Sequence, residues 1–239
     1  MVAKSQLKFI KSLHQKKYRN QHGLFLAEGV KFVGDLLKAG CDPRHLYSTE
    51  EMAGFPGAHP ISESELNRVS TLVQPNKVLG VFPIPSQTPP QFSDWLLALD
   101  GVSDPGNLGT IIRLCDWFGI RHILCSPDTV DCYNPKVLMA TMGSISRVQV
   151  HYAPLEEVLS QSGMPLFGAS MEGEPLKEFV FPEEGIIVMG SESHGISSGV
   201  RNQLQRLLSI PSQAAHGAES LNVGTATAIV LYELRRGTP

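Results

Sequence analysis

The segment LALDGVSDPGNLGTIIRLCDWFG (Leu97–Gly119) joins a short apolar run to the start of a helix. The run ends at Asp100, and Asp104 followed by Pro105 is typical of a helix N-cap and first turn. Similar apolar runs alternate with stretches of helical period along the rest of the chain, which predicts an α/β fold with a mostly parallel sheet covered on both faces. The expected strands are Trp95–Leu99, Arg121–Cys125, Val148–His151, Leu166–Ala169, Ile186–Met189 and Leu207–Ile210, and the expected helices are Asn107–Phe118, Pro135–Gly143, Leu155–Ser160, Ser197–Gln205 and Leu221–Arg236.

The N-terminal part of the chain predicts a separate, small α/β unit. Residues 5–18 read as one basic helix, and Ser62 followed by Glu65 three positions later is a capping box. PIPSQTPPQ (Pro83–Gln91) contains four prolines, which favour extended chain. We therefore expect domains at 1–84 and 94–239 joined by a linker at 85–93. The other expected elements of the small unit are strands at Gly23–Gly29, His45–Ser48 and Lys77–Pro83 and helices at Val30–Ala39 and Ser62–Val69.

The composition is that of an ordinary globular protein, with 239 residues, 42% apolar and 18% charged. This excludes a disordered chain and a small disulfide scaffold. The apolar runs fall far short of the ~20 residues that cross a bilayer, and the N-terminus lacks the apolar core of a secretory signal. Cys41, Cys115, Cys125 and Cys132 form no CxxC pair, which argues against structural zinc and fits a reducing compartment. We expect a cytoplasmic protein without membrane association.

The charge is distributed unevenly along the chain. The net charge is -3, but residues 1–44 contain nine Lys and Arg against three Asp and Glu, a net of +6. A basic end on an acidic body is typical of proteins that bind a polyanion, because contacts from Lys and Arg to phosphates release counterions. A solvated amphipathic helix is the alternative interpretation.

Two residues of the opening segment, Asn107 and Arg113, are candidate functional residues. Asn107 and Arg113 lie six positions apart, about 120° around a helix and ~9 Å along it. Arg113 is the lone cation of the stretch IIRLCDWFG. An arginine near the carboxyl edge of a parallel sheet, where such sheets bind their ligands, is suited to a phosphate group. A purely structural role is the alternative.

A glycine-rich loop follows another expected strand in GIIVMGSESHGIS (Gly185–Ser197). The loop carries Glu192 and His194 between Gly190 and Gly195. It lacks the lysine of a P-loop and the spacing of GxGxxG, and two possible ligands without ligand spacing do not make a metal site. A loop that lets backbone approach a ligand fits this pattern, and a simple turn with a solvated glutamate is the alternative.

The C-terminal segment Leu207–Arg236 contains a strand, a loop of small residues and a long apolar helix. Ser220 is the expected N-cap of that helix. Asn222 falls in its first turn, where no structural role is expected for it. The small residues Gly224, Ala226 and Ala228 favour close packing against another helix or another subunit.

Together and in this order, the three segments resemble the SpoU family of RNA ribose 2′-O-methyltransferases, which belongs to the SPOUT class. The pattern D-P-x-N-x-G-x-x-x-R is met from Asp104 to Arg113, and G-x-E-x-x-G-[LI]-S from Gly190 to Ser197. The pattern I-P…S-L-N-V is met by Ile210, Pro211 and residues 220–223. Residues 128–137 also look like the loop that the family has between its motifs.

The N-terminal stretch Lys16–Leu37 looks like the RNA substrate domain that precedes many SpoU catalytic domains. The chain departs from the family pattern K-x-x-R-A-S, because Met139 replaces the arginine and Thr141 the serine. The loop Ser212–Glu219 is also about two residues longer than usual. These departures bear on how RNA is positioned.

The resemblance implies a C-terminal domain tied in a deep trefoil knot, an exception to the rule against knots. It implies S-adenosylmethionine as cofactor, held by backbone groups around Gly190, Ile210 and Leu221, with no metal. It also implies a homodimer through the C-terminal domain, with the closing helix as a candidate contact.

The resemblance further implies that Arg113 is a catalytic residue that contacts the target phosphate. Because arginine has a pKa of about 12.5–13.8, we expect Arg113 to act electrostatically and not as the base. Asn107, Glu192, Ser220 and Asn222 are expected to orient Arg113, the ribose and the loops. Lys16, Lys17 and Arg19, together with Arg113, are the expected RNA contacts.

Two other classes of function stay open at this point. A noncatalytic RNA-binding protein with a methyltransferase-like fold would keep the basic N-terminus but would not need Asn107, Arg113, Glu192 and Asn222 together. A nucleotide-dependent α/β enzyme of another kind predicts a phosphate loop or an acidic ribose reader after the first strand, and the sequence contains neither.

Overall fold

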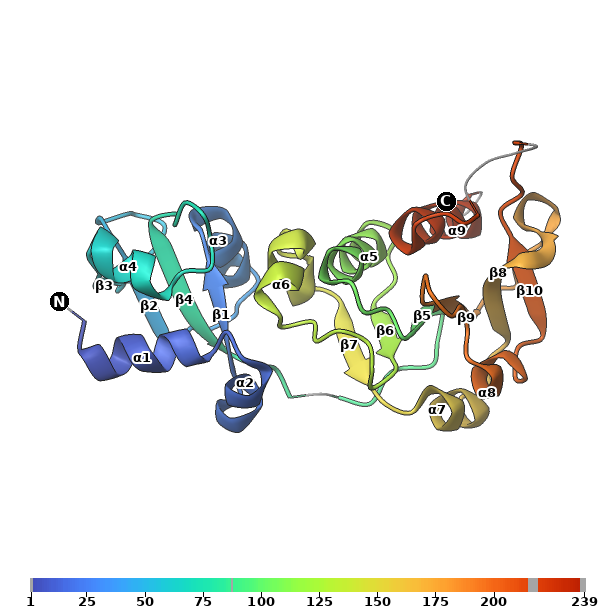
Figure 1. Ribbon diagram of the computed structural model, residues 1–239, viewed down its shortest axis with the longest axis horizontal. Coiled ribbons are helices and arrows are strands. Elements are labelled where there is room, and N and C mark those ends of the chain that lie inside the picture. Colours follow the sequence, from blue (N-terminus) through green and yellow to red (C-terminus); the bar gives the residue numbers. More distant parts are fainter. Residues whose placement is uncertain (1, 87, 215–218, 237–239) are drawn as a thin grey trace. The chain divides into compact units, whose positions relative to one another are not determined.

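The computed structural model describes residues 2–86, 88–214 and 219–236 (Figure 1). The chain forms two compact units: unit 1 is Met1–Ser86 with Asp131–Ser146, and unit 2 is Gln87–Val130 with Arg147–Pro239. A segment from the middle of the chain therefore packs with the N-terminal unit. The domains expected from the sequence, 1–84 and 94–239, stay a prediction. They place Asp131–Ser146 in the C-terminal domain, whereas the compact units place it with the N-terminal one.

Unit 1 is built on a four-stranded sheet in the order β1-β4-β2-β3. β4 (Val78–Pro83) pairs antiparallel with both β1 (Leu24–Glu28) and β2 (His45–Ser48), and β3 (His59–Pro60) is a short parallel addition to β2. Side chains alternate between the faces of a strand. One face packs against α1 (Lys4–Ser12) and α4 (Glu63–Val69), and the other against α3 (Val30–Lys38) and α6 (Pro135–Thr141).

The expected single helix over residues 5–18 is two helices, α1 and α2 (Lys16–His22). Gln15 between them has extended backbone, with φ -96° and ψ 131°. The carbonyl oxygens of Leu13 and His14, at the end of α1, accept hydrogen bonds from the Arg19 guanidinium at 2.9 and 2.8 Å. A helix leaves its last carbonyls without intrahelical partners, so a side chain that satisfies them stabilises the break.

Unit 2 contains a six-stranded sheet in the order β10-β8-β9-β5-β6-β7, and every pairing in it is parallel. This confirms the parallel α/β fold expected from the alternation of strands and helices. The strands are β5 (Trp95–Asp100), β6 (His122–Cys125), β7 (Gln149–Tyr152), β8 (Leu166–Pro175), β9 (Gly185–Gly190) and β10 (Arg206–Ser209).

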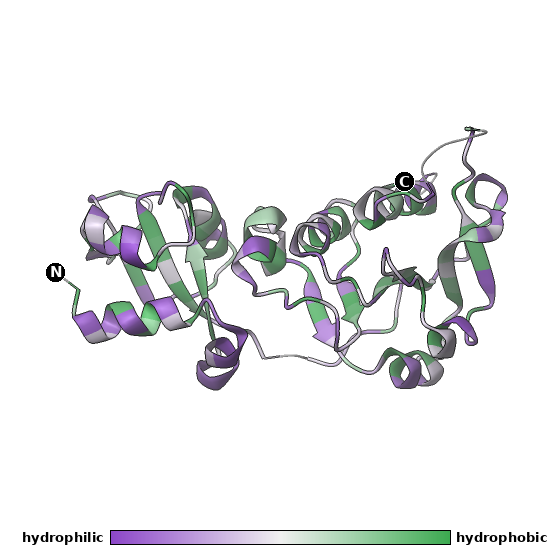
Figure 2. Ribbon diagram, viewed as in Figure 1, coloured by the Kyte–Doolittle hydropathy of each residue, from purple (hydrophilic) through white to green (hydrophobic). Residues whose placement is uncertain are grey.

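Helices cover both faces of this sheet. α5 (Pro105–Trp117) and α9 (Val223–Arg235) pack side by side, and α7 (Leu155–Gln161) and α8 (Ser198–Arg201) lie across the sheet from them (Figure 1). The central strands are apolar along their length (Figure 2), as expected for a parallel sheet buried on both sides. No helix in the described part of the chain is long and apolar enough to span a bilayer.

Two of the three expected helix caps are confirmed. Ser62 and Glu65 form the capping box of α4, and Asp104 caps α5 by accepting a hydrogen bond from the Asn107 amide. The prediction for Ser220 is wrong, because α9 begins at Val223 and its N-cap is Asn222. The Asn222 Oδ1 accepts hydrogen bonds from the backbone amides of Gly224 and Thr225. Asn222 therefore has a structural role that was not expected from the sequence.

Candidate active site

Three polar side chains from distant segments meet in unit 2. Asn107 lies in the first turn of α5, Glu192 in the loop after β9, and Asn222 at the start of α9. β5 and β9 are parallel neighbours whose last residues, Asp100 and Gly190, pair with each other. Their following loops therefore leave the sheet at the same edge, and this brings the first two segments together.

The three side chains form a closed set of hydrogen bonds, here called the Asn107–Glu192–Asn222 triad. Glu192 Oε1 accepts from Asn107 Nδ2 at 2.8 Å and from Asn222 Nδ2 at 2.8 Å. Asn222 Nδ2 also donates to Asn107 Oδ1 at 2.9 Å. The amide of Val223 approaches Glu192 Oε1 at 3.5 Å. Because a carboxylate only accepts, it fixes the orientation of both amides and joins three loops.

Four residues hold the β9 loop in the shape that presents Glu192: Gly190, Ser191, Gly195 and Asp100. A Cβ on Gly190 would lie 2.2 Å from the carbonyl carbon of Gly195, so only glycine fits, and Gly195 has a φ of +67°. Ser191 and Gly195 exchange backbone hydrogen bonds across the loop. Asp100, which the sequence interpretation missed, is buried and accepts a hydrogen bond from the Ser197 amide at 2.7 Å. Its signal was a carboxylate at the end of an otherwise apolar strand.

Arg113 lies on α5, nearly two turns beyond Asn107, and is exposed. Within residues 2–86, 88–214 and 219–236 its guanidinium forms no hydrogen bond or ion pair. Ser220 is also exposed, and no described residue shares a hydrogen bond with it. The structure thus joins three of the five expected catalytic residues and leaves these two side chains facing solvent.

The expected cofactor residues lie on three loops of unit 2. Gly190 ends β9, Ile210 follows β10 and is half-buried, and Leu221 precedes α9 with 47% of its surface exposed. Part of the long loop Ser212–Glu219, residues 215–218, lies outside the described residues.

The described part of the chain contains neither a cluster of metal ligands nor an activated cysteine. No group of three or more His, Cys, Asp or Glu is placed to hold a metal ion there. None of the four cysteines, all of which lie in the described part of the chain, forms a disulfide. Burial, with a contribution from the Asp116 charge, raises the pKa of the Cys115 thiol on α5, which keeps it protonated and unreactive.

Arg19 requires a correction among the expected RNA contacts. Its side chain is 3% exposed, and its Nε and Nη2 donate to Asp131 Oδ2 at 3.1 and 2.5 Å. Its remaining bonds go to the two carbonyls at the end of α1. A guanidinium that is buried and bonded to Asp131 and to two carbonyls holds unit 1 together and is not accessible to RNA. Lys16 and Lys17, in contrast, are exposed on α2.

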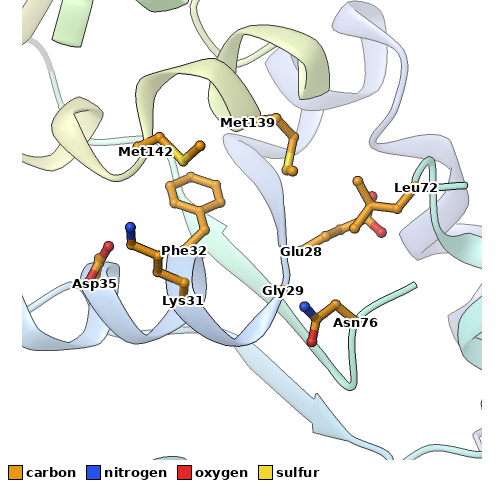
Figure 3. Close-up of a pocket in the computed structure, with 9 residues that line it drawn as sticks. All are labelled: Glu28, Gly29, Lys31, Phe32, Asp35, Leu72, Asn76, Met139 and Met142. Atoms are coloured by element: carbon orange, nitrogen blue, oxygen red, sulfur yellow. The ribbon is translucent and has the colours of Figure 1, made fainter. Parts of the chain in front are cut away.

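Figure 3 shows a pocket within unit 1, here called the methionine pocket, with a volume of about 130 Å³. Met139 and Met142 on its wall are 40% and 50% exposed. Since Met139 stands where the SpoU pattern has an arginine, a thioether replaces a possible phosphate contact here. Thr141 is buried and its hydroxyl donates to the Leu138 carbonyl at 2.7 Å, so it does not face RNA. The other lining residues are Glu28, Gly29, Lys31, Phe32, Asp35, Leu72 and Asn76.

Comparison with known proteins identifies the class that this fold and these motifs define. Residues 94–232 match the SpoU rRNA Methylase family, and residues 4–80 match the MRM3-like substrate binding domain. The chain belongs to the SpoU rRNA methylase family, which confirms the resemblance carried by the three motifs.

Individual relatives agree with this assignment over nearly the whole chain. A Bacillus subtilis protein named 23S rRNA (guanosine(2553)-2′-O)-methyltransferase RlmP is 30% identical over 98% of this chain and 97% of its own length. A solved structure from Porphyromonas gingivalis, assigned to the TrmH family, is 38% identical over 99% of both chains with a TM-score of 0.90. An AdoMet-bound rRNA methyltransferase from Sinorhizobium meliloti is 28% identical, covers 100% of this chain and 98% of its own, and has a TM-score of 0.88.

Proposed function

We propose that this protein transfers a methyl group from S-adenosylmethionine to a ribose 2′-hydroxyl of ribosomal RNA. The observation that carries this proposal is the Asn107–Glu192–Asn222 triad, which joins one residue from each of the three family motifs through direct hydrogen bonds. Family membership and the rRNA methyltransferases among the relatives support the same reaction. A noncatalytic RNA-binding role would not require this arrangement.

The reaction is an in-line displacement at a methyl carbon. The ribose oxygen would form a bond to that carbon while its proton passes to solvent water, and the carbon–sulfur bond would break with its electron pair remaining on sulfur. S-adenosylmethionine, when bound, supplies the electrophilic methyl group. Holding the reactants in line contributes up to ~7–11 kcal/mol in favourable cases, so the protein acts chiefly by positioning.

Arg113 is the catalytic residue on the RNA side of the site. Its planar guanidinium grips two oxygens of the target phosphate and stabilises negative charge that develops on the ribose oxygen. Its exposure and its lack of partners among the described residues leave it free for this contact. The triad positions α5, which carries Arg113, against the β9 loop, and Ser220 lies beside the triad in sequence.

The cofactor is held by backbone groups around Gly190, Ile210 and Leu221. Gly190 packs against the backbone of Gly195, which shapes the β9 loop, and the exposed Leu221 side chain would offer an apolar contact to the cofactor. The family's deep trefoil knot, formed in residues 94–239, would enclose this site.

The protein acts as a homodimer in the cytoplasm. Trp117 on α5 and Tyr232 on α9 are 84% and 56% exposed, although the two helices pack against each other. Large exposed aromatic side chains are enriched in protein interfaces, so this pair of helices is the proposed contact with a second copy. Unit 1 supplies RNA affinity through Lys16 and Lys17.

Two measurements test the proposal. Calorimetry with S-adenosylmethionine in the presence of a chelator should show binding, because no metal takes part. The purified protein should then transfer labelled methyl from the cofactor to ribosomal RNA of a strain that lacks the gene, and mass spectrometry should place the label on a ribose. Cofactor binding without methyl transfer to that RNA contradicts the proposed substrate. Undetectable binding of both the cofactor and its demethylated product contradicts the enzyme itself.

A further inference from the structure

A second hollow in unit 1 is lined by residues of α1, α2, β1 and β2 and by Arg44, which precedes β2. It is here called the basic basin and has a volume of about 270 Å³. This is far more than the ~10–15 Å³ that one water molecule needs. Neither the motifs nor the proposed reaction uses these residues. The basin is lined by Gln6, Phe9, His22, Leu24, Arg44 and His45.

The charges around the basin are of one sign. Arg44 is exposed, and no described residue forms an ion pair with it. His22 and His45 add two imidazoles, and none of the described lining residues is a carboxylate. Burial, the Arg44 charge and the nearby His59 lower the pKa of His45, as expected for a site that contains positive charge and no anion.

Gln6 and Phe9 line the α1 side of the basin. The Gln6 amide nitrogen is buried from solvent and has no acceptor among the described residues, so it does not face the basin. The Phe9 ring packs edge-on against His22 with centroids 5.1 Å apart, which holds this imidazole at the rim.

We propose that the basic basin binds a phosphate group of the RNA backbone. The Arg44 guanidinium can donate to two phosphate oxygens, and the imidazoles supply further N–H donors. His22 lies on α2, the helix that also carries Lys16 and Lys17. This inference rests on the proposed function. Because a phosphate contact contains no base information, the basin positions RNA and does not select its sequence.

Removal of the Arg44 charge tests the proposal through salt dependence. Binding of deproteinised bacterial 23S ribosomal RNA to the full chain is measured across a potassium chloride series. We expect Arg44→Ala to weaken binding about tenfold at low salt and to reduce the slope of log affinity against log salt by about one. Arg44→Lys should keep the slope and bind with intermediate affinity, because it keeps the charge and loses the fork.

The matched control is Lys38→Ala, which removes one exposed positive charge from α3, on the other face of the unit 1 sheet. It should bind RNA with the wild-type slope. Melting temperatures establish that each variant is folded. An unchanged salt slope for Arg44→Ala, or an equal loss of RNA affinity in Arg44→Ala and Lys38→Ala, overturns the phosphate site in the basin. Methyl transfer by the wild-type protein in the same assay leaves the proposed function standing. A wild-type protein that neither binds nor methylates the RNA overturns both.

Discussion

The triad of unit 2 and the exposed basic residues of unit 1, Lys16, Lys17 and Arg44, use polar side chains in opposite ways. In the triad each side chain contacts both others, so the position of each depends on the other two. In unit 1, Lys17 and Arg44 are exposed and do not bond to each other, and their charge attracts an anion without a fixed contact geometry. The comparison separates residues that work through geometry from residues that work through charge.

The largest expected effect tests whether Arg113 acts through the planar geometry of its guanidinium or only through its positive charge. Arg113→Lys keeps the charge and removes the planar fork. We expect single-turnover methylation to slow about 100- to 1,000-fold, as for loss of one transition-state donor, while cofactor affinity and melting temperature stay near wild type. The control Arg121→Lys alters another exposed arginine of the same unit. Normal methylation, or a failure explained by unfolding, would remove Arg113 from the catalytic set.

The next effect concerns Arg19, which was expected to contact RNA at the surface of unit 1 and is buried in the structure. Arg19→Met leaves Asp131 without its partner and two carbonyls of α1 without their donor. We expect the free energy of unfolding to fall by about 3 kcal/mol, since breaking a buried pair is costly. Lys17→Met, on the exposed side of α2, should change it by less than about 0.5 kcal/mol. Denaturant unfolding followed by circular dichroism measures both, and equal effects would show that Arg19 is not a buried structural residue.

A smaller effect separates the two roles of Asn222. Asn222→Ala removes both the N-cap of α9 and the bond to Glu192, and should cost about 1 kcal/mol of stability. Asn222→Asp keeps a good capping oxygen but places a second carboxylate against Glu192. We expect Asn222→Asp to retain the helix cap and still lower methylation, because the triad loses a donor. If methylation instead follows thermal stability across both variants, Asn222 is only a cap.

The smallest effect is a pH dependence of stability at a histidine pair of unit 2. His122 and His151 share a hydrogen bond of 3.1 Å and stack with ring centroids 5.3 Å apart. Burial lowers the pKa of both, with a further contribution from Arg121 at His122 and from His122 at His151. The unfolded chain therefore binds more protons, so the stability that the pair provides is complete above about pH 6.5 and is lost as pH falls below it.

Unfolding curves between pH 5 and 8 measure this dependence. The double variant His122→Gln with His151→Gln should reduce the loss of stability at low pH. His194→Gln, which changes a histidine on the exposed β9 loop, should leave it intact. A double variant with the full wild-type loss would mean that other groups cause the acid dependence.

Local spacing explains which details of the fold could be predicted. The capping box of Ser62 and the cap at Asp104 each depend on residues three positions apart, and both are present. Ser220 was the expected cap of α9, but the cap is Asn222, which also bonds to Glu192, thirty positions away. β8 continues to Pro175, beyond its expected end, because its pairing with β10 resumes after a bulge. A single segment contains no signal for either result.

The sequence by itself determined the alternation of strands and helices, the parallel sheet that follows from it, and the three motifs that assign the family. These features are local, since periodicity and spacing are set within one turn or one strand. The tertiary structure alone decided that Asn107, Glu192 and Asn222 bond directly, that Arg19 is buried, and that Gln6, His22 and Arg44 surround one basin. Those outcomes depend on which segments meet after folding, and the identity of a residue does not reveal whether its polar atoms face water, RNA or another side chain.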